Sequence, residues 1–346
     1  MDRTGLNAGG LSRALLLVLL VLISGCSGPG RSADKLPLRI AIPRQPSSAL
    51  ALLAMEGGFF EAEGLAPRYT IHPSGKRALE EALLAGTADI ALASDLPVLE
   101  HLSRGEDLLI LATVQSVRSL NAVVGNRDRG IGQFADLREK RVGLQPHSAV
   151  HYFLECALVA HDVDIRTVEI HAMPIEELVP ALVRGDVDAV SIREPYLTDA
   201  VHRLGSRSVV LRAPWVYPQF DLALVRRSFA ENHAPELELF LRALLRAEQF
   251  LRTNPDEAAL MVARTLNLGV EETGENLSNA ITRVELPQSM ILHFEEQLRW
   301  IREEGTDPVR TPLALDLLEI IHPGPLRAIQ PERVDIAGFA YWEPRE

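Results

Sequence analysis

Four short polar segments could bind a ligand, because each follows an apolar strand and precedes a helix. A helix that begins just after a strand presents free backbone N–H groups and the positive end of its dipole, which suits an anion or another hydrogen-bond acceptor. Ser48 and Ser148 are expected to cap two of these helices, whose ends would face each other. The ligand-binding candidates in the four segments are Arg44, Gln45, Ser47, Ser48, Ser94, Asp95, Gln145, His147, Ser148, Arg193, Glu194 and Tyr196.

An internal repeat relates these segments in pairs. QPSSA at residues 45–49 agrees with QPHSA at 145–149 in four of five positions, and ALLAGTAD at 82–89 is similar to ALVRGDVD at 181–188. The offsets of 100 and 99 residues predict two similar α/β lobes. Asp95 and Glu194 are also 99 residues apart, and we expect both carboxylates at strand ends that look into a cleft between the lobes. Either of them could instead only cap the helix after it.

A fifth candidate segment, WVYPQFD at residues 215–221, combines aromatic rings with polar tips. Trp215, Tyr217 and Phe220 could stack on a ring or enclose an aliphatic chain, and Asp221 adds a carboxylate. The alternative interpretation is a packed linker between the lobes.

The sequence lacks the motifs of enzymatic catalysis and of metal or cofactor binding. His147 and His151 are one helical turn apart, but no third ligand is in view. There is no HExxH, no cysteine pair with metal spacing, no GxSxG and no Walker or Rossmann glycine pattern. We therefore expect no catalytic residue, no metal and no cofactor.

The first 26 residues have the features of an export signal with a lipidation site. Arg3 and Arg13 supply positive charge, and residues 14–23 form an apolar run that is too short for a stable transmembrane helix. The run ends in Ile-Ser-Gly-Cys at 23–26, which is typical of a bacterial lipobox, so lipidation is expected at Cys26. The alternative is a plain signal peptide with an incidental cysteine. Residues 27–35 are predicted to form a polar tether.

The composition fits an exported protein that binds neither nucleic acid nor an anionic membrane surface. The chain has 47 acidic and 35 basic residues and a formal net charge of −12, which disfavours both partners. If Cys26 is lipidated, Cys156 is the single thiol left and no disulfide can form within the chain. Its position on an apolar helix face predicts a buried, inert thiol.

Strands and helices are predicted to alternate up to residue 212, and the rest of the chain is predicted to be mostly helical. The predicted strands are 38–42, 65–71, 89–93, 108–114, 121–125, 141–144, 167–171, 189–192, 209–212 and 221–225. The predicted helices include 76–84, 96–103, 150–158, 175–183, 195–203, 235–252, 255–266 and 287–304.

Four segments resemble, in order, parts of ABC-transporter periplasmic substrate-binding proteins. They are GGFFEAEGL (57–65), ALLAGTADIALAS (82–94), ADLREKRVGLQPHSAVHYFL (135–154) and ALVRGDVDAVSIREPY (181–196). The similarity is to the group that binds nitrate, sulfonates, taurine and thiamine precursors, and it extends from residue 36 to 325. It implies an α/β, type II periplasmic-binding-protein fold. This fold has two lobes with doubly wound sheets, a two-strand hinge and a helical C-terminal tail on lobe one.

The resemblance also implies the domain organisation. Residues 1–26 would be the signal and 27–35 the tether, lobe one would comprise 36–121 and 222–346, and lobe two would comprise 122–221. The strands at 121–125 and 221–225 would lie side by side as the hinge. Ser116 and Arg118 follow a strand at a place where this family often contacts its ligand.

The function implied is solute capture for import. The protein would be monomeric, held at the periplasmic or cell-surface face of the membrane by its lipid anchor alone, and would deliver its solute to an ABC permease and its ATPase. A sulfonate, taurine-like or pyrimidine-like solute suits the mixture of anion-binding loops and carboxylates better than nitrate does. The alternative is a sensor that presents its closed form to a receptor or sensor kinase. A related fold serves a pyrimidine synthase that depends on a cysteine-rich segment, which this chain lacks.

Overall fold

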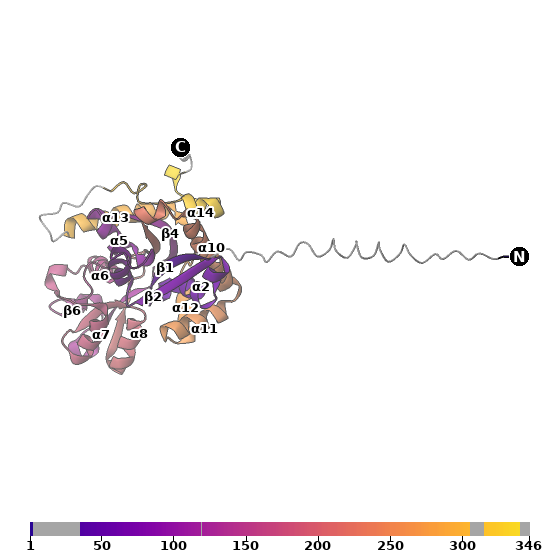
Figure 1. Cartoon of the computed structure of the whole chain (residues 1–346). Coiled ribbons are helices and arrows are strands. Elements are labelled where there is room, and N and C mark those ends of the chain that lie inside the picture. Colours follow the sequence, from indigo (N-terminus) through magenta and orange to yellow (C-terminus); the bar gives the residue numbers. More distant parts are fainter. Residues whose placement is uncertain (3–34, 119, 305–314, 340–346) are drawn as a thin grey trace. The chain divides into compact units, whose positions relative to one another are not determined.

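The computed structural model describes residues 1–2, 35–118, 120–304 and 315–339 (Figure 1). The chain divides into Met1–Asp34 and Lys35–Glu346, and the helices and strands belong to the second unit. The expected signal peptide, Cys26 and most of the expected tether therefore lie outside the described residues.

The first sheet has the strand order β2-β1-β3-β10-β4, and together with its helices we call it lobe one. β1 pairs in parallel with β2 and β3, whereas β10 runs antiparallel to β3 and β4. β3, β4 and β10 are buried along almost their whole length, as is typical of a sheet that is covered on both faces. Its elements are β1 (Leu36–Pro43), η1 (Pro46–Ser48), α2 (Ala49–Glu56), α3 (Phe59–Ala62), β2 (Leu65–His72), α4 (Gly75–Ala78), η2 (Leu79–Leu84), β3 (Ile90–Ser94), α5 (Asp95–Ser103), β4 (Leu108–Val117) and β10 (Gln219–Arg226).

The second sheet, in what we call lobe two, has the order β7-β6-β8-β5-β9. Helix α6 packs against β5 and β8, and its apolar residues join the main core. α7 and α8 pack together and bury a separate apolar cluster that includes Leu178, Leu182 and Leu197. The elements are β5 (Asn121–Asn126), β6 (Arg141–Leu144), α6 (Ala149–Ala160), β7 (Glu169–Ala172), α7 (Ile175–Arg184), β8 (Ala189–Arg193), α8 (Tyr196–Leu204) and β9 (Ser208–Leu211).

Equivalent ion pairs hold β1 in lobe one and β6 in lobe two, as the sequence repeat suggests. In each lobe an arginine of the strand binds an aspartate that follows a Gly-terminated helix, and the same guanidinium donates to the carbonyl oxygen of that glycine. The pairs are Arg39–Asp89 at 2.5 Å with Gly86 at 2.9 Å, and Arg141–Asp188 at 2.7 Å with Gly185 at 2.9 Å.

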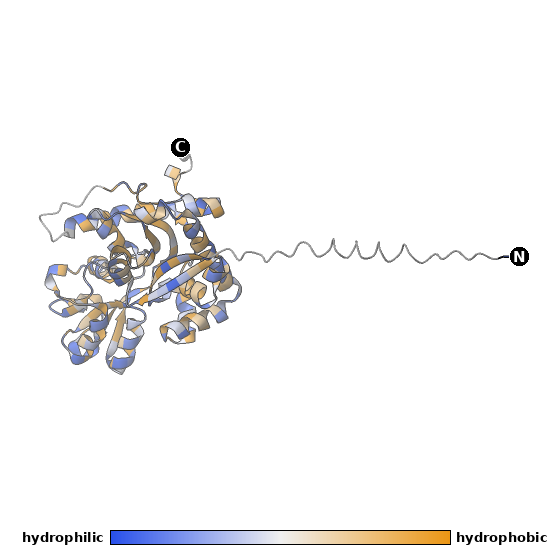
Figure 2. Ribbon diagram, in the orientation of Figure 1, coloured by the Kyte–Doolittle hydropathy of each residue, from blue (hydrophilic) through white to orange (hydrophobic). Residues whose placement is uncertain are grey.

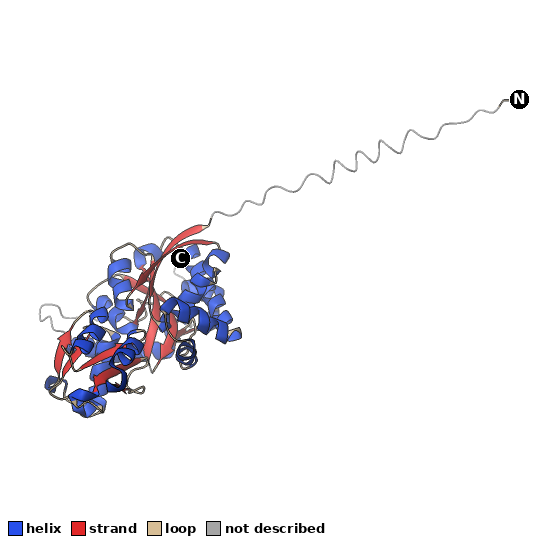
Figure 3. Cartoon of the chain, turned by 90° about the horizontal axis from the view of Figure 1, so that it is seen from below, coloured by secondary structure: helices blue, strands red, loops and turns tan. Residues whose placement is uncertain are grey.

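The C-terminal tail packs mainly on lobe one, as predicted. α10 lies on α2 and α3, where the rings of Phe60 and Phe240 stack with centroids 5.6 Å apart, and α11 also packs on α2. The helices turn their apolar residues toward the strands and their polar residues outward (Figure 2). Helices surround the strands (Figure 3). The tail comprises α9 (Arg227–Ala230), α10 (Ala234–Thr253), α11 (Pro255–Leu266), α12 (Val270–Ser278), β11 (Leu286–Pro287), α13 (Gln288–Glu304), α14 (Gly324–Ile329) and β12 (Val334–Asp335).

The chain crosses from the first sheet to the second between β4 and β5, and it returns at residues 212–218, between β9 and β10. The expectation that 121–125 and 221–225 lie side by side is wrong, because β5 belongs to the second sheet and β10 to the first. Each strand fills an inner position in its own sheet, where both of its edges are hydrogen-bonded. A side-chain hydrogen bond of 3.1 Å from Asn121 to Gln219 links the starts of the two strands.

Candidate ligand-binding cleft

The polar segments predicted to bind ligand follow β1, β3, β6 and β8, and the structure buries most of their side chains. The carboxyl ends of neighbouring parallel strands lie at one edge of a sheet, where α/β proteins bind their ligands. Because buried polar groups need hydrogen-bond partners, their contacts indicate which of them could still bind a ligand. The buried candidates are Gln45, Ser47, Ser48, Ser94, Asp95, Gln145, Ser148, Arg193, Glu194, Tyr217 and Asp221.

A buried hydrogen-bond network centred on Asp221 joins the lobes. Gln45 Nε2 donates to Ser47 Oγ at 2.7 Å and to Asp221 Oδ1 at 3.4 Å. Gln219 Nε2 donates to Asp221 Oδ2 at 2.8 Å, while Gln219 Oε1 accepts the bond from Asn121 of lobe two. Burial raises the pKa of Asp221 to about 6, although the charge of Arg193 opposes this rise. Asp221 can therefore donate or accept a hydrogen bond close to neutral pH.

Arg193, the last residue of β8, is a buried cation at this network. Arg193 is 3% exposed, and its Nη1 has no hydrogen-bond partner among the described residues. Burial lowers the pKa of Arg193, and Asp221 is the charge that opposes this most. A buried donor without an acceptor costs free energy, which a ligand can recover. Ser48 Oγ, Ser94 Oγ and Asn121 Oδ1 are further buried atoms that find no partner within the described part of the chain.

Asp95 was expected to face the ligand, but donors of the chain itself occupy its carboxylate. Oδ1 accepts from the backbone N of Leu96 at 2.8 Å and from the hydroxyl of Tyr217. Oδ2 accepts from the backbone N of Phe220 at 2.9 Å, and Nε2 of His293 lies at 3.5 Å. These contacts fasten the start of α5 to the second crossing segment and to α13. They favour the structural role of Asp95 that the sequence left open.

Glu194 occupies the equivalent position in lobe two and meets another carboxylate. Its Oε2 accepts from the backbone N of Thr198 at 3.1 Å, and the Thr198 hydroxyl donates to Oε1 of Glu272 on α12. Burial, followed by the charge of Glu272, raises the pKa of Glu194 to about 7. Sequence reasoning missed Glu272 because α12 was not predicted. The available signal was Gly269 ahead of two acidic residues in a first helical turn.

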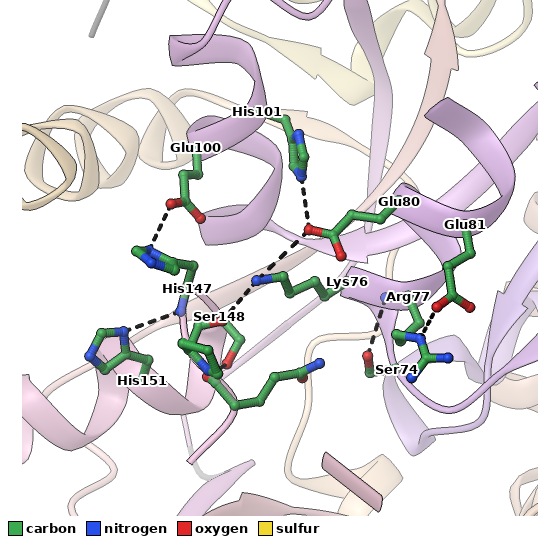
Figure 4. Close-up of polar contacts among 12 residues, drawn as sticks. Ser74, Lys76, Arg77, Glu80, Glu81, Glu100, His101, His147, Ser148 and His151 are labelled. Carbon is green, nitrogen blue, oxygen red and sulfur yellow. Dashed lines mark hydrogen bonds and ion pairs between the residues drawn. The ribbon is translucent and has the colours of Figure 1, made fainter. Parts of the chain in front are cut away.

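Further polar contacts bridge the lobes, and Figure 4 shows those of Lys76 and of Glu100 with His147. Each joins lobe one or the tail to lobe two, so the structure corresponds to closed lobes. The atom pairs are Lys76 Nζ–Pro146 O (2.8 Å), Arg77 Nη1–Glu176 Oε1 (2.7 Å), Glu100 Oε1–His147 Nδ1 (2.8 Å), Pro73 O–Tyr196 Oη (3.4 Å) and Trp300 Nε1–Glu155 Oε2 (2.6 Å).

Ser148 stands at the start of α6 as predicted, but the expectation that its hydroxyl caps the helix is wrong. The hydroxyl donates to the carbonyl oxygen of Gln145 at 2.6 Å, and no side-chain capping bond forms. His147 has a φ of 52°, and this tight turn brings Ser148 back toward Gln145. The hydroxyl of Ser48 makes no capping bond either.

The remaining candidate residues make their contacts outside the Asp221 network. Arg44 is exposed, and its Nη2 donates to the carbonyl oxygen of Leu266 at 3.4 Å. Ser116 and Arg118 line a cavity of about 450 Å³ between the end of β4 and α13. Trp215 is 61% exposed. Tyr217 is buried between the rings of Tyr152 and His293, with centroids 5.0 and 5.6 Å away.

Burial raises the pKa of Cys156 to about 11, which leaves the thiol a poor nucleophile at neutral pH. Within the described residues, no group of three or more His, Cys, Asp or Glu side chains is arranged to hold a metal ion. In the same part of the chain, no helix is long and apolar enough to cross a membrane.

Comparison with known proteins identifies relatives that bind small solutes. An aliphatic sulfonates-binding protein of Bacillus subtilis is 29% identical over 250 residues, which are 71% of this chain and 75% of that protein. The taurine-binding periplasmic protein of Escherichia coli is 25% identical, with 63% and 68% of the two chains covered. The formylaminopyrimidine-binding protein of Halalkalibacterium halodurans is 24% identical, with 83% and 91% covered.

Solved structures confirm the fold class. The alkanesulfonate-binding protein SsuA of Xanthomonas axonopodis, bound to MOPS, superposes with a TM-score of 0.70 at 19% identity and covers 84% of this chain and 99% of its own. The periplasmic aliphatic sulphonate binding protein SsuA of Escherichia coli gives a TM-score of 0.66 at 19% identity, with 80% and 95% covered. The model of the NMT1/THI5-like family matches residues 45–258, more than half of the chain. The protein therefore belongs to the NMT1/THI5-like family, whose relatives named above are solute-binding proteins.

Proposed function

We propose that this protein captures a small organic sulfonate between its two lobes and delivers it to an ABC importer. The observation that carries the proposal is Arg193, a buried guanidinium in the cleft whose Nη1 has no partner among the described residues. A sulfonate supplies one negative charge and three acceptor oxygens, which suit a guanidinium and nearby hydroxyl groups. The hydroxyls of Ser48 and Ser94, for which the described residues supply no partner, are further donors.

The solute should also carry a hydrogen-bond donor at its other end. Asn121 Oδ1 is a buried acceptor without a partner among the described residues, and Asp221 adds carboxylate oxygens beside it. Ionised Asp221 would also disfavour a solute that offers acceptor oxygens alone, such as nitrate. An aminosulfonate such as taurine has both, with acceptor oxygens on the sulfonate and a donor on the amino group.

A pyrimidine is less well supported than a sulfonate. Stacking on a ring needs a free aromatic face. Tyr217 packs against Tyr152 and His293, and Trp215 points its ring to the surface beside His161, with centroids 6.2 Å apart. The contacts of these aromatic residues therefore favour a role in packing over stacking on a ligand.

Capture would proceed by closure of the lobes, with no bond made or broken. The closed lobes hold each other through the bridging contacts of Lys76, Arg77 and Glu100, which a ligand in the cleft reinforces by satisfying Arg193. Closed and open forms differ in surface, which lets a permease distinguish loaded from empty protein.

Binding measured by calorimetry tests the proposal, with taurine, ethanesulfonate, nitrate and formylaminopyrimidine as probes. We expect a sulfonate to bind most tightly. Arg193→Gln should weaken that binding by about 1.5–3 kcal/mol, the range for a hydrogen bond to a charged group, or about ten- to 150-fold. Arg207→Gln is the matched control, because Arg207 is an exposed arginine of the same lobe. Tight nitrate or pyrimidine binding without sulfonate binding contradicts the proposal, as does an unchanged affinity in Arg193→Gln.

We also propose that the protein is exported and held at the membrane by a lipid on Cys26, which lies outside the described residues. The support is the lipobox-like run after an apolar segment, together with a periplasmic relative. Cys26→Ala should leave the protein unprocessed or release it from the membrane fraction. A variant that is processed and membrane-bound like the wild type rules out lipidation there.

A further inference from the structure

We propose that closure of the lobes takes up a proton at the Glu194–Glu272 contact, so that solute affinity rises as the pH falls. This inference rests on the proposed function, because it concerns regulation of the same cleft. The two glutamates come from opposite sides of it: Glu194 follows β8 of lobe two, and Glu272 lies on α12 of the tail, which packs against η1 of lobe one.

The contact exists while the lobes are closed. Thr198 binds both carboxylates, through its backbone N to Glu194 and through its hydroxyl to Glu272. Opening of the cleft separates lobe two from lobe one and the tail, and therefore separates Thr198 and Glu194 from Glu272. In the open form each carboxylate meets water and ionises at an ordinary pH.

Thr198 joins Glu194 and Glu272, and two like charges held this close repel, so the pair favours a proton on one of them. Burial is the largest cause of the raised pKa of Glu194, about 7, and the charge of Glu272 is the second. Between about pH 4.5 and 7 the closed form thus binds a proton that the open form does not.

No nearby cation replaces this proton among the described residues. Arg193 adjoins Glu194 in sequence, but Asp221, Tyr217 and Asp95 are the groups that act on it most strongly. Arg44 is exposed and directed to Leu266. The titratable groups on the elements around the pair are Arg44 before η1, Arg193 on β8, Tyr196, Asp199, His202 and Arg203 on α8, Asp256, Glu257 and Arg264 on α11, and Glu271 and Glu275 on α12.

A second contact also holds the lobes together, because His147 Nδ1 faces Glu100 Oε1 across the lobes. Around this pair lie Lys76, Glu80 and His101 of lobe one and His151 of lobe two (Figure 4). Arg104 of lobe one also pairs with Glu100.

The test measures ethanesulfonate binding at pH 5.5 and pH 8.5, because this probe has no group that titrates in that range. Wild-type affinity should be at least about tenfold lower at pH 8.5, and calorimetry at pH 6 in buffers of different ionisation enthalpy should report uptake of about one proton. Glu272→Gln supplies an amide donor to Glu194 without a proton, so its affinity ratio between the two pH values should be at least about fivefold smaller. Glu271→Gln, an exposed neighbour with the same change of charge, should behave like the wild type.

An equal pH ratio in wild type and Glu272→Gln overturns the inference, and so does an absence of proton uptake in the wild type. If ethanesulfonate binds at neither pH, the sulfonate proposal fails by itself. The same comparison of the wild type with Glu272→Gln at pH 5.5 and 8.5 is then made with whichever of taurine, nitrate and formylaminopyrimidine the wild type binds. Any titration of the solute cancels between the two proteins, so an equal pH ratio would refute the proton uptake.

Discussion

His147 of lobe two and Glu100 of lobe one lie 2.8 Å apart, measured from imidazole Nδ1 to carboxylate Oε1. His171 and Glu169 lie at the same distance, but both belong to β7 within lobe two. One histidine–glutamate pair thus spans the cleft and the other does not. Substitution of the two histidines can therefore separate lobe closure from local stability.

His147→Gln should weaken solute binding by about 0.5–1 kcal/mol, or about two- to fivefold, because a partly exposed ion pair contributes little. His171→Gln should leave the affinity unchanged. Calorimetry at pH 6 with the sulfonate that the wild type binds measures both effects. An equal effect of the two substitutions would mean that the pair across the cleft has no special role in closure.

Asp188→Asn should destabilise lobe two, because Asp188 accepts hydrogen bonds from the side chain and the backbone of Arg141. Burial by itself would raise the pKa of Asp188, but these hydrogen bonds more than offset burial and lower it. The stabilisation is therefore present above the ordinary pKa of an aspartate and is lost as the pH falls through the lowered pKa.

We expect a decrease of about 1–2 kcal/mol in the free energy of unfolding at pH 7, measured with a chemical denaturant. Asp186→Asn is the control, because Asp186 pairs with Arg184 at the surface. A decrease no larger than that of the control would contradict a structural role for the repeated arginine–aspartate pair.

Local patterns in the sequence predicted the elements whose signals lie within them. Strand 141–144 and helix 255–266 were predicted with the bounds that β6 and α11 have, since an apolar run and an Asn-Pro start lie inside these segments. The repeat likewise aligned Asp89 with Asp188, whose ion pairs are equivalent. Such features depend on neighbours along the chain.

Partners that are distant in sequence could not be predicted in this way. Asp95 and Glu194 share one local pattern, yet Asp95 meets Tyr217 and His293, whereas Glu194 meets Glu272. Thr198 and Glu272 are 74 residues apart, and no local pattern records their contact. The same holds for β10, whose place between β3 and β4 is set by pairing with strands far from it in sequence.

Asp221→Asn should remove part of the pH dependence of stability. The pKa of Asp221 rises from an ordinary 3.8 to about 6 through burial, so the folded protein binds the proton more tightly than the unfolded chain does. This group's contribution is fully present below the ordinary pKa and is lost as the pH rises through about 6. The loss amounts to about 2–3 kcal/mol by pH 8.

Denaturant unfolding at pH 4.5 and pH 8 should therefore show a smaller decrease in Asp221→Asn than in the wild type. Asp128→Asn is the control, because Asp128 is exposed and its substitution should leave the decrease unchanged. If Asp221→Asn and the wild type lose the same stability, Asp221 is ionised in the folded protein at both pH values.

Closure of the lobes should be visible in solution. The chain passes between two separate sheets after β4 and again after β9, which permits a hinge motion. The bridging contacts of Lys76 and Glu100 close the cleft, while the unpartnered guanidinium nitrogen of Arg193 favours opening until an acceptor arrives. Small-angle scattering should give a smaller radius of gyration with a saturating sulfonate than without it. Arg193→Gln should keep the larger radius at that concentration, and an unchanged radius in the wild type would argue against a hinge.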